Sequence, residues 1–270
     1  MIRRKARSWV LLAFLVSTFG CATFEGGRSF NILSTQDEIA LGNEVAAEVE
    51  QQETVLDDTA VQSYVAEIGQ RLARVATRQD VPYAFKVIDA PDTVNAFALP
   101  GGNMYVYTGL MKLCEDEAEL AAVMAHEIGH VAAHHHGESL TRAYGYGLIT
   151  RILLGEAPNE RAQVVAGLLG QAVTSRYSRE QEREADRLGM EFLFRAGYPP
   201  DAMIAFMNKM RAEEAKEGGG RWLPIFASHP PTTERLHLLH GLLAQYPPDL
   251  VAASPRYADR YQQHALAPLE

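Results

Sequence analysis

The chain has 270 residues, of which 47% are hydrophobic and 22% are charged, and its formal net charge at pH 7 is -9. These fractions are ordinary for a globular protein, and the length is enough for one catalytic domain with short appendages. Basic residues gather only at the extreme N-terminus. The composition therefore excludes a general nucleic-acid binder and predicts no nucleic-acid partner.

The N-terminus has the pattern of an export signal. A basic leader, residues 1–7, precedes an apolar segment, residues 9–19, that is too short to cross a bilayer comfortably. We predict a signal peptide over residues 1–20, and Cys21 resembles the acylated cysteine of a bacterial lipoprotein. Residues 21–33 would then tether the domain to the membrane. A plain cleaved signal and an uncleaved anchor are the alternatives.

The chain contains two cysteines. If Cys21 carries lipid, Cys114 has no partner, and its apolar surroundings predict a free, buried thiol. If Cys21 carries no lipid, a Cys21–Cys114 disulfide is the alternative in an oxidising compartment.

Two helices and a small sheet are predicted in the first 110 residues. The first helix begins near Thr35, which has capping-box spacing with Glu38, and the second follows Asp58. Alternation of apolar and polar residues predicts three short strands, residues 83–89, 94–99 and 104–107, the last two joined by a turn at residues 100–103. The sheet either packs against the next helix or offers an edge that pairs with an extended peptide.

The run from Asp116 to Ala133 has helical periodicity and contains no proline, which predicts a helix. His126 and His130 are four residues apart and therefore share a face of this helix. Two neutral imidazoles at this spacing can hold one zinc ion, and Glu127 can act as general base on a water activated by the metal. The alternative, a helix with two surface histidines, explains neither the glutamate nor the apolar surroundings.

Three more histidines, His134, His135 and His136, follow at the predicted end of this helix. Imidazoles suit the C-terminal end of a helix dipole, so we expect no metal role for them. Residues 147–154 and 161–174 are predicted to form two apolar helices, which are too short to span a membrane. We expect them to be core or a lid over the cleft, and a surface that touches the membrane is the third possibility.

A catalytic zinc site needs three protein ligands and an open position for water. The helix predicted over residues 179–195 supplies several acids. Glu182 and Asp186 share one face of it, whereas Glu184 points roughly the opposite way. We assign Glu182 as the third ligand and Asp186 as the carboxylate that orients a ligand histidine. Taken alone, this acidic helix would be a solvated face.

The rest of the chain is predicted to be mainly helical. Further helices are expected over residues 201–217 and 232–246. Before the last of them, two prolines follow His229 and would hold its backbone stiffly. Residues 247–270 are a proline-containing tail that is expected to lie along the surface or to fray.

Several of these motifs together resemble one family. The motif His126-Glu127-Ile128-Gly129-His130, followed by Glu182-x-x-x-Asp186, resembles the gluzincin metallopeptidases of the HtpX and CAAX-prenyl-protease type. Residues 38–42, 95–102 and 228–230 also resemble motifs of this family. The resemblance covers most of residues 34–245, but the membrane-spanning helices of the HtpX and prenyl-protease branches and the tetratricopeptide tail of the periplasmic assembly-factor branch are absent from this sequence. The nearest match is a small lipoprotein branch of the family.

The resemblance implies an α+β, mainly α-helical fold: a zincin-like domain over residues 34–246, in which the small sheet packs on the motif helix. It implies that the edge strand lines the cleft and binds substrate through four residues: Asn95, Ala96, Phe97 and Ala98. It also offers His229 as a catalytic residue that stabilises the oxyanion. A neutral His229 that occupies the fourth zinc position and holds the enzyme off is the alternative, and a packing histidine is the third.

We therefore predict an endopeptidase with one Zn²⁺ per chain and Glu127 as general base. Its expected substrates are misfolded or misassembled cell-envelope polypeptides. Its expected place is the periplasmic face of a bacterial envelope, on the outer membrane, because Ala22 rather than aspartate follows Cys21. A chaperone-like assembly factor that rarely cleaves is the alternative, and a structural zinc protein is disfavoured by the adjacent Glu127.

Overall fold

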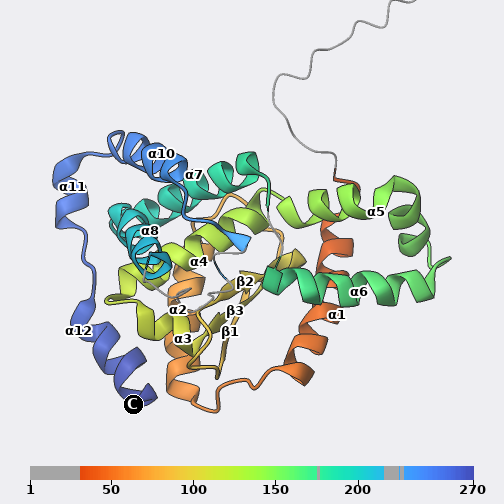
Figure 1. Cartoon of the computed structure of the whole chain (residues 1–270), viewed down its shortest axis with the longest axis horizontal. Coiled ribbons are helices and arrows are strands. Elements are labelled where there is room, and N and C mark those ends of the chain that lie inside the picture. The colour runs from red at the N-terminus through yellow and green to blue at the C-terminus, as the bar shows by residue number, and fades with distance from the viewer. Residues whose placement is uncertain (1–30, 175–176, 216–224, 226–227) are drawn as a thin grey trace, which may run out of the picture.

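A computed structural model describes residues 31–174, 177–215, 225 and 228–270. The predicted signal peptide, Cys21 and most of the tether lie outside these residues, as does most of the segment just before His229. The described chain is mainly helical and contains one small sheet (Figure 1), which confirms the predicted fold class. In chain order, the helices and strands are α1 (Thr35–Gln52), α2 (Thr59–Ala73), β1 (Ala84–Ile88), β2 (Ala96–Ala98), η1 (Pro100–Gly102), β3 (Asn103–Tyr107), α3 (Thr108–Leu113), α4 (Glu117–Ala132), α5 (His135–Leu153), α6 (Pro158–Thr174), α7 (Arg179–Arg195), α8 (Asp201–Glu214), α10 (Thr233–Leu243), α11 (Pro248–Ala253), α12 (Ala258–Tyr261), η2 (Gln262–Leu266) and η3 (Ala267–Leu269).

The sheet has the strand order β1-β3-β2. β3 pairs in parallel with β1 and antiparallel with β2, and the turn η1 joins β2 to β3. These strands agree with the three that the alternation predicted. Because β3 is central, the outer edge of β2 is not paired with another strand of this sheet.

Alternate residues of β3 face two different cores, as the two-residue period of a strand requires. Met104 and Val106 belong to a core shared with α2, α4, α7 and α8. Tyr105 and Tyr107 belong to a second core shared with α1, α5 and α6. The sheet therefore lies between two helical layers, and α4, which carries the predicted motif, packs on one of its faces.

The helix α1 packs closely against the turn that follows the edge strand. A Cβ atom at Gly42 would lie 1.8 Å from the carbonyl oxygen of Pro100, so only glycine fits there. This helix begins at Thr35, as predicted, but the predicted capping box was wrong: Ser34 is the N-cap and shares a capping box with Asp37, rather than Thr35 with Glu38.

Glu38 has a different role, which is to tie α1 to the end of α4. Its carboxylate is buried and lies 2.6 Å from the guanidinium of Arg78. The same guanidinium donates to the carbonyl of Val131, 3.0 Å away, in the last turn of α4. This buried pair therefore fixes the C-terminal end of the motif helix against α1.

The two predicted apolar helices are α5 and α6, which reach out to one side of the molecule (Figure 1). α5 begins earlier than predicted, at His135, and is interrupted at Gly145, where φ is 75°. α6 begins at Pro158, earlier than the predicted residue 161, as suits a residue without an N–H. Ile149 and Ile152 of α5 are buried in the second core with Val164 of α6, so both helices contribute to this core.

The tail beyond residue 246 does not fray. Tyr261 is fully buried in the first core, and its hydroxyl donates to the carbonyl of Met111 at 2.7 Å. Arg260 beside it lies 3.3 Å from the buried carboxylate of Glu117, which also accepts from the hydroxyls of two tyrosines, Tyr64 and Tyr198. The tail is therefore packed against the first turn of α4.

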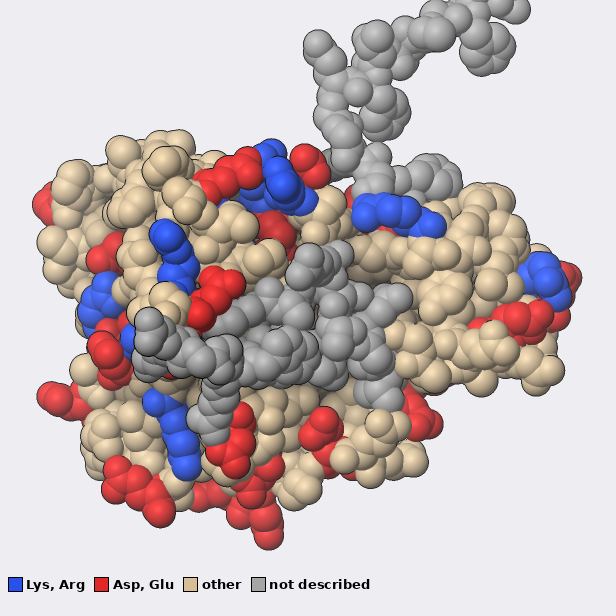
Figure 2. Space-filling model, viewed as in Figure 1, with Lys and Arg blue, Asp and Glu red and all other residues tan. Residues whose placement is uncertain are grey.

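Cys114 is free and buried, as predicted. None of the described helices combines the length and the apolarity that a membrane crossing requires. On the face shown in Figure 2, the lysine and arginine side chains of the described residues are scattered among aspartate and glutamate rather than gathered in a stripe.

Candidate metal centre

Two glycines let α4 and α7 approach closely, and this contact creates the site. A Cβ atom at Gly129 would lie 2.9 Å from the carbonyl oxygen of Ala185, and one at Gly189 would lie 3.1 Å from the backbone nitrogen of His126. Because both positions lack a side chain, the acidic face of α7 lies directly against the histidine face of α4. The predicted ligands from the two helices are brought together in this way.

Four buried side chains converge on one point: His126, His130, Glu182 and His229. His126 Nε2 lies 3.1 Å from His130 Nε2 and 3.2 Å from His229 Nδ1. The Glu182 carboxylate lies 2.9 Å from His229 Nδ1 and 3.5 Å from His130 Nε2. The ligand atoms of a tetrahedral zinc, bound at 2.0–2.2 Å, would lie about 3.3 Å apart. The spacing of these residues therefore fits a zinc ion.

The second nitrogens of the two α4 histidines already have partners. His126 Nδ1 lies 3.0 Å from a carboxylate oxygen of Asp186. His130 Nδ1 lies 2.9 Å from Nδ1 of His135. Contacts of this kind fix the orientation of a ligand imidazole. The Nε2 atoms of both rings are thus aimed at the centre of the cluster, as a metal ion requires.

Arg235, in the first turn of α10, was not predicted to be near the site. Its guanidinium makes two hydrogen bonds to Asp186, at 2.8 and 2.6 Å, and lies 2.7 Å from Glu182. All three side chains are almost completely buried. Glu182 and Asp186 lie on one face of α7, where their negative charges repel each other. The positive charge of Arg235 offsets this repulsion.

Charges set the protonation of this cluster. Burial alone would raise the pKa of Glu182, but the positive charges of His229 and Arg235 bring it well below its usual value. Burial is likewise outweighed at Asp186, chiefly by Arg235, so its pKa is lowered. Burial would lower the pKa of His126, but hydrogen bonds to Asp186 and Glu182 raise it to about 9. Both acids are therefore ionised at neutral pH.

Glu127 lies beside the cluster and faces the edge strand. Its carboxylate accepts a hydrogen bond from the backbone N–H of Ala98 at 3.2 Å, and its other oxygen lies 3.3 Å from His229 Nε2. The side chain is 2% exposed. The general base of the predicted reaction is thus held between β2 and His229.

The four residues predicted to bind substrate are all buried in or beside β2. The N–H of Leu99 and the carbonyl of Asn95 bond to β3, so the backbone groups of Ala96 and Ala98 point to the outer edge. Both polar atoms of the Asn95 side chain are buried without a hydrogen-bond partner among the described residues. Phe97 instead points to the second core, where it packs against Tyr105.

His134, His135 and His136 do not form a solvated helix end. α4 ends at Ala132, His134 adopts a left-handed conformation with φ of 60°, and the chain turns into α5. His135 and His136 are buried. His136 Nε2 lies 2.9 Å from the carbonyl oxygen of Ala98. The predicted place at the C-terminal end of the motif helix was wrong for His135 and His136, because the chain reverses at His134 and buries these two imidazoles.

Two further contacts, one on His130 and one on His135, were not predicted. The ring of Tyr177 stacks on it with a centroid distance of 3.8 Å. Glu184, which faces away from the ligands as predicted, lies 3.4 Å from His135 Nε2. Tyr177 directly precedes Ser178, the N-cap of α7, and this position could have indicated that Tyr177 lies near the predicted ligands on that helix. No local pattern pointed to His135.

The sequence matches known proteins over most of its length. The model of "Peptidase family M48" matches residues 59–243. The chain is 29% identical over 240 residues to the beta-barrel assembly-enhancing protease of Escherichia coli. This match covers 85% of the chain and 48% of that protein. It is 30% identical over 221 residues to the metalloprotease YcaL of Escherichia coli, over 78% of this chain and 82% of that protein. It is also 30% identical over 182 residues to the mitochondrial metalloendopeptidase OMA1 of Schizosaccharomyces pombe, over 67% of this chain and 53% of that protein. The chain thus spans about half the length of the beta-barrel assembly-enhancing proteases that it matches.

Proposed function

Because the chain belongs to peptidase family M48, we propose that it is a zinc-dependent endopeptidase that hydrolyses misfolded or misassembled cell-envelope proteins. One observation carries the proposal: four buried donor atoms converge at zinc-ligand spacing beside a glutamate that is not one of them. His126, His130 and Glu182 would hold the ion, one per chain. Asp186 would orient His126.

Zinc bound there would polarise the scissile carbonyl and lower the pKa of the attacking water. Glu127 would take the proton of that water and return it to the leaving amine. The N–H of Ala98 fixes one oxygen of its carboxylate, so the group is aimed before substrate arrives. Arg235 balances the charge of Glu182 and Asp186 when no metal is bound.

The edge of β2 is the proposed binding surface for the peptide. The outward backbone groups of Ala96 can pair with an extended chain, as strands do when they add to a sheet edge. The side-chain amide of Asn95, which has no hydrogen-bond partner among the described residues, would bond to one peptide group of the substrate. The contacts of Ala98 with Glu127 and His136 place the end of this pairing beside the general base.

We propose that His229, as placed, holds the site closed. Its Nδ1 lies among the ligand atoms, 2.9 Å from Glu182, and its Nε2 lies 3.3 Å from Glu127. The imidazole thus occupies the place that a water and a carbonyl oxygen need. If the ring moved outward, it could instead stabilise the oxyanion, the second role that the sequence suggested.

The cellular part of the proposal rests on separate observations. Several bacterial relatives carry the name beta-barrel assembly-enhancing protease, and the N-terminus has the pattern of an export signal. We propose a lipid anchor at Cys21 and a position on the periplasmic face of the outer membrane. Replacing Cys21 by serine should release the protein from the membrane fraction, and unchanged fractionation would contradict the anchor.

The enzymatic part is tested by digestion. The purified protein from residue 22 onward should contain one zinc per chain and cleave an unfolded porin or casein, whereas Glu127→Gln should keep zinc and lose activity by about 10²–10⁴-fold. Glu180→Gln is the matched control, because Glu180 is an exposed acid in the first turn of α7. Wild-type rates in Glu127→Gln would remove the general-base assignment. A wild type that binds zinc and suppresses porin aggregation without cleavage would favour the chaperone-like alternative.

A further inference from the structure

Two helices reach out from the domain and expose apolar side chains to solvent. We call residues 142–168, which include much of α5 and the first part of α6, the arm (Figure 1). Among the residues that the structure describes, three large hydrophobic side chains are exposed: Tyr146, Leu154 and Leu250. Two of them lie on the arm, where Tyr146 is 62% and Leu154 is 67% exposed.

The exposed side chains of the arm share one face of α5. Tyr146, Thr150 and Leu154 follow one another at intervals of four residues, so they lie on the same side of the helix. Ile149 and Ile152 lie on a different side and are buried in the second core. The face that carries Tyr146 and Leu154 is therefore turned away from that core.

Charge is sparse on the arm. Residues 143–150 and 162–168 contain no lysine, arginine, aspartate or glutamate. Figure 2 shows the surface over the arm mainly in tan, with blue and red side chains near its two ends. Two of the charged residues, Arg151 and Glu160, lie 3.8 Å apart and form an ion pair. Contact of this surface with an apolar medium would therefore remove few charges from water.

The predicted tether leaves the domain beside the arm. The described chain begins at Asn31, ten residues after Cys21. Asn31 lies against the first turn of α5, because a Cβ atom at Gly137 would lie 2.4 Å from its Oδ1. It also donates to the buried Glu38 at 2.8 Å, and Leu33 is buried in the second core. A membrane anchor before Asn31 would therefore attach at the base of the arm.

The length of this tether matches the length of the arm. Ten extended residues span at most about 36 Å. α6 has 17 residues and is therefore about 26 Å long, and it runs between the outer end of the arm and its base. A bilayer that holds an anchor at Cys21 is thus within reach of the outer end of the arm.

We propose that the arm is a membrane-contact surface and that its Tyr146–Leu154 face rests in the interfacial layer of the bilayer that holds the anchor. Tyrosine suits this layer, because its ring is apolar and its hydroxyl is polar. The opposite face stays packed in the second core, so the contact is made at the bilayer surface. The inference rests on the proposed lipid anchor and deepens it: one anchor point leaves the domain free to rotate, whereas a second contact fixes the side that faces the membrane.

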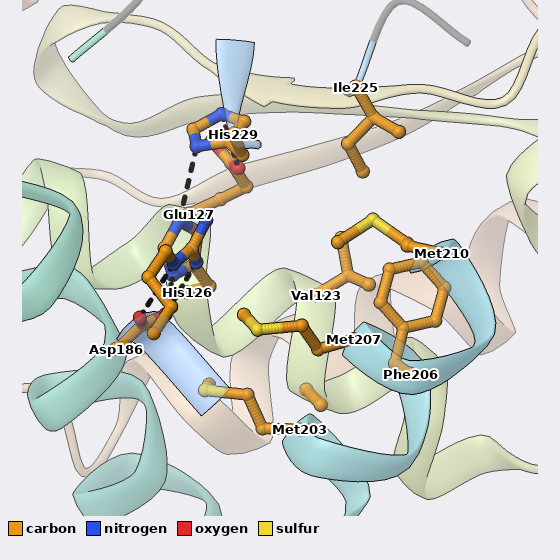
Figure 3. A pocket seen from close by; sticks show the side chains of 12 residues that line it. Val123, His126, Glu127, Asp186, Met203, Phe206, Met207, Met210, Ile225 and His229 are labelled. Carbon is orange, nitrogen blue, oxygen red and sulfur yellow. Dashed lines mark hydrogen bonds and ion pairs between the residues drawn. The ribbon is translucent and has the colours of Figure 1, made fainter. Parts of the chain in front are cut away.

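The metal centre is separate from this surface. The pocket beside His126 and Glu127 (Figure 3) is lined by residues of α4, α7, α8 and α10 and by residues just before α10. None of its described lining residues belongs to the arm. Substitutions at positions 146 and 154 should therefore leave zinc content and casein cleavage in solution unchanged, which separates this inference from the proposed peptidase activity.

A tryptophan on the arm reports the contact directly. Tyr146→Trp is compared with Leu250→Trp, since Leu250 is also exposed but lies on α11, at the opposite side of the molecule (Figure 1). The lipidated full chains are inserted into vesicles of phosphatidylethanolamine and phosphatidylglycerol, and the parent chain supplies the background from Trp222. Lipid brominated on its acyl chains should quench the added emission of Tyr146→Trp by about half, because the interfacial layer borders the acyl region. It should leave Leu250→Trp unchanged. Equal quenching of both proteins, or none in Tyr146→Trp, would overturn the inference.

Vesicle partition without lipidation measures the arm alone. The protein from residue 22 onward contains every described residue and lacks the anchor. Its partition coefficient for the same vesicles should fall by about tenfold when Tyr146→Ser and Leu154→Ser are combined, because two apolar groups no longer leave water. Leu250→Ser is the matched control and should partition as wild type does. Wild-type partition no greater than that of the double variant would contradict the contact.

The outcomes distinguish the arm from the anchor. If Cys21→Ser releases the protein from the membrane fraction but brominated lipid does not quench Tyr146→Trp, the anchor stands and the arm contact fails. If the protein without lipid binds vesicles through the arm but Cys21 carries no lipid in cells, the arm contact stands and the anchor fails. A blue shift of Tyr146→Trp that appears without vesicles and grows with protein concentration would show a second copy on this face, and would overturn the inference.

Discussion

Two sets of buried imidazoles, His126 in the metal centre and the pair His135 and His136 at the turn between α4 and α5, differ in their pKa. Hydrogen bonds that His126 donates to the carboxylates of Asp186 and Glu182 outweigh burial and raise its pKa to about 9. At the turn, burial dominates and lowers the pKa of His135 and of His136 to about 4. The difference teaches that burial favours a neutral imidazole, as it also does at His130, whose pKa is lowered although Glu182 lies near it. Positive charge is kept at His126, where Asp186 adds a second carboxylate.

The two groups nevertheless depend on each other. His135 bonds to the second nitrogen of His130, as Asp186 does for His126. A charged carboxylate therefore orients one ligand and a neutral imidazole orients the other. The turn supplies structure to the metal centre without adding charge to it.

Of the substitutions considered, removal of the Glu182 carboxylate should change the metal centre most. Glu182→Ala should lose most of the bound zinc, because it deletes a ligand and leaves the buried Arg235 with one carboxylate instead of two. Glu184→Ala is the control, since Glu184 is half-exposed and contacts His135 but no ligand. Zinc is quantified by atomic emission on the purified proteins. Equal zinc loss in both variants would place the third ligand elsewhere on α7.

Because His135 and His136 at the turn are buried in the neutral form, we expect the folded protein to lose stability at acid pH. Their pKa in the folded protein, about 4, lies below the unfolded value near 6.5, so the unfolded chain binds more protons between these values. Stability is therefore full above about pH 6.5 and falls as the pH drops toward 4, by up to about 3 kcal/mol for each histidine. His136→Gln, which can still donate to Ala98, should reduce this fall, whereas His237→Gln on the exposed face of α10 should not. Urea unfolding at pH 7, 5.5 and 4.5 measures the slope, and an unchanged slope in His136→Gln would contradict the argument.

The two orienting residues should have smaller and similar effects on metal affinity. Asp186→Ala and His135→Ala should each weaken zinc binding by about 10–100-fold, the usual result of removing a partner of a ligand histidine. Competition with a chromogenic chelator measures the affinity. If His135→Ala binds zinc as wild type does, the His130 ring is held by its other contacts, such as the stacked Tyr177.

The smallest effect is expected for His229. His229→Ala should raise the rate of casein cleavage several-fold with zinc retained, because the imidazole lies where the reacting groups must enter. A lower rate with zinc retained would instead show that His229 stabilises the transition state. No change in rate or zinc content would leave it a packing residue.

Features fixed by neighbours in the sequence could be predicted. The i, i+4 spacing placed His126 and His130 on one face, and the same spacing placed Glu182 and Asp186 together and Glu184 away from them. The strands were found within two residues of their ends, because alternation is a local pattern.

Features fixed by contacts between distant segments could not. Arg235 reaches Asp186 across 49 positions, and nothing in the sequence around Arg235 distinguishes it from a surface arginine at a helix start. His135 and His136 were misjudged because a left-handed residue, His134, turns the chain inward after α4. Spacing shows which residues share a helix face, but not which other helix will cover that face.

The order in which the site is made follows from the salt bridge between Arg235 and the acids of α7. During synthesis, His126, His130, Glu182 and Asp186 all emerge before His229 and Arg235. Until residue 235 has been added, the two acids lack the buried cation that lets them lie side by side. A growing chain therefore carries the hydrolytic motif long before it can complete the site, so assembly of the metal centre is a late event in the biogenesis of the protein.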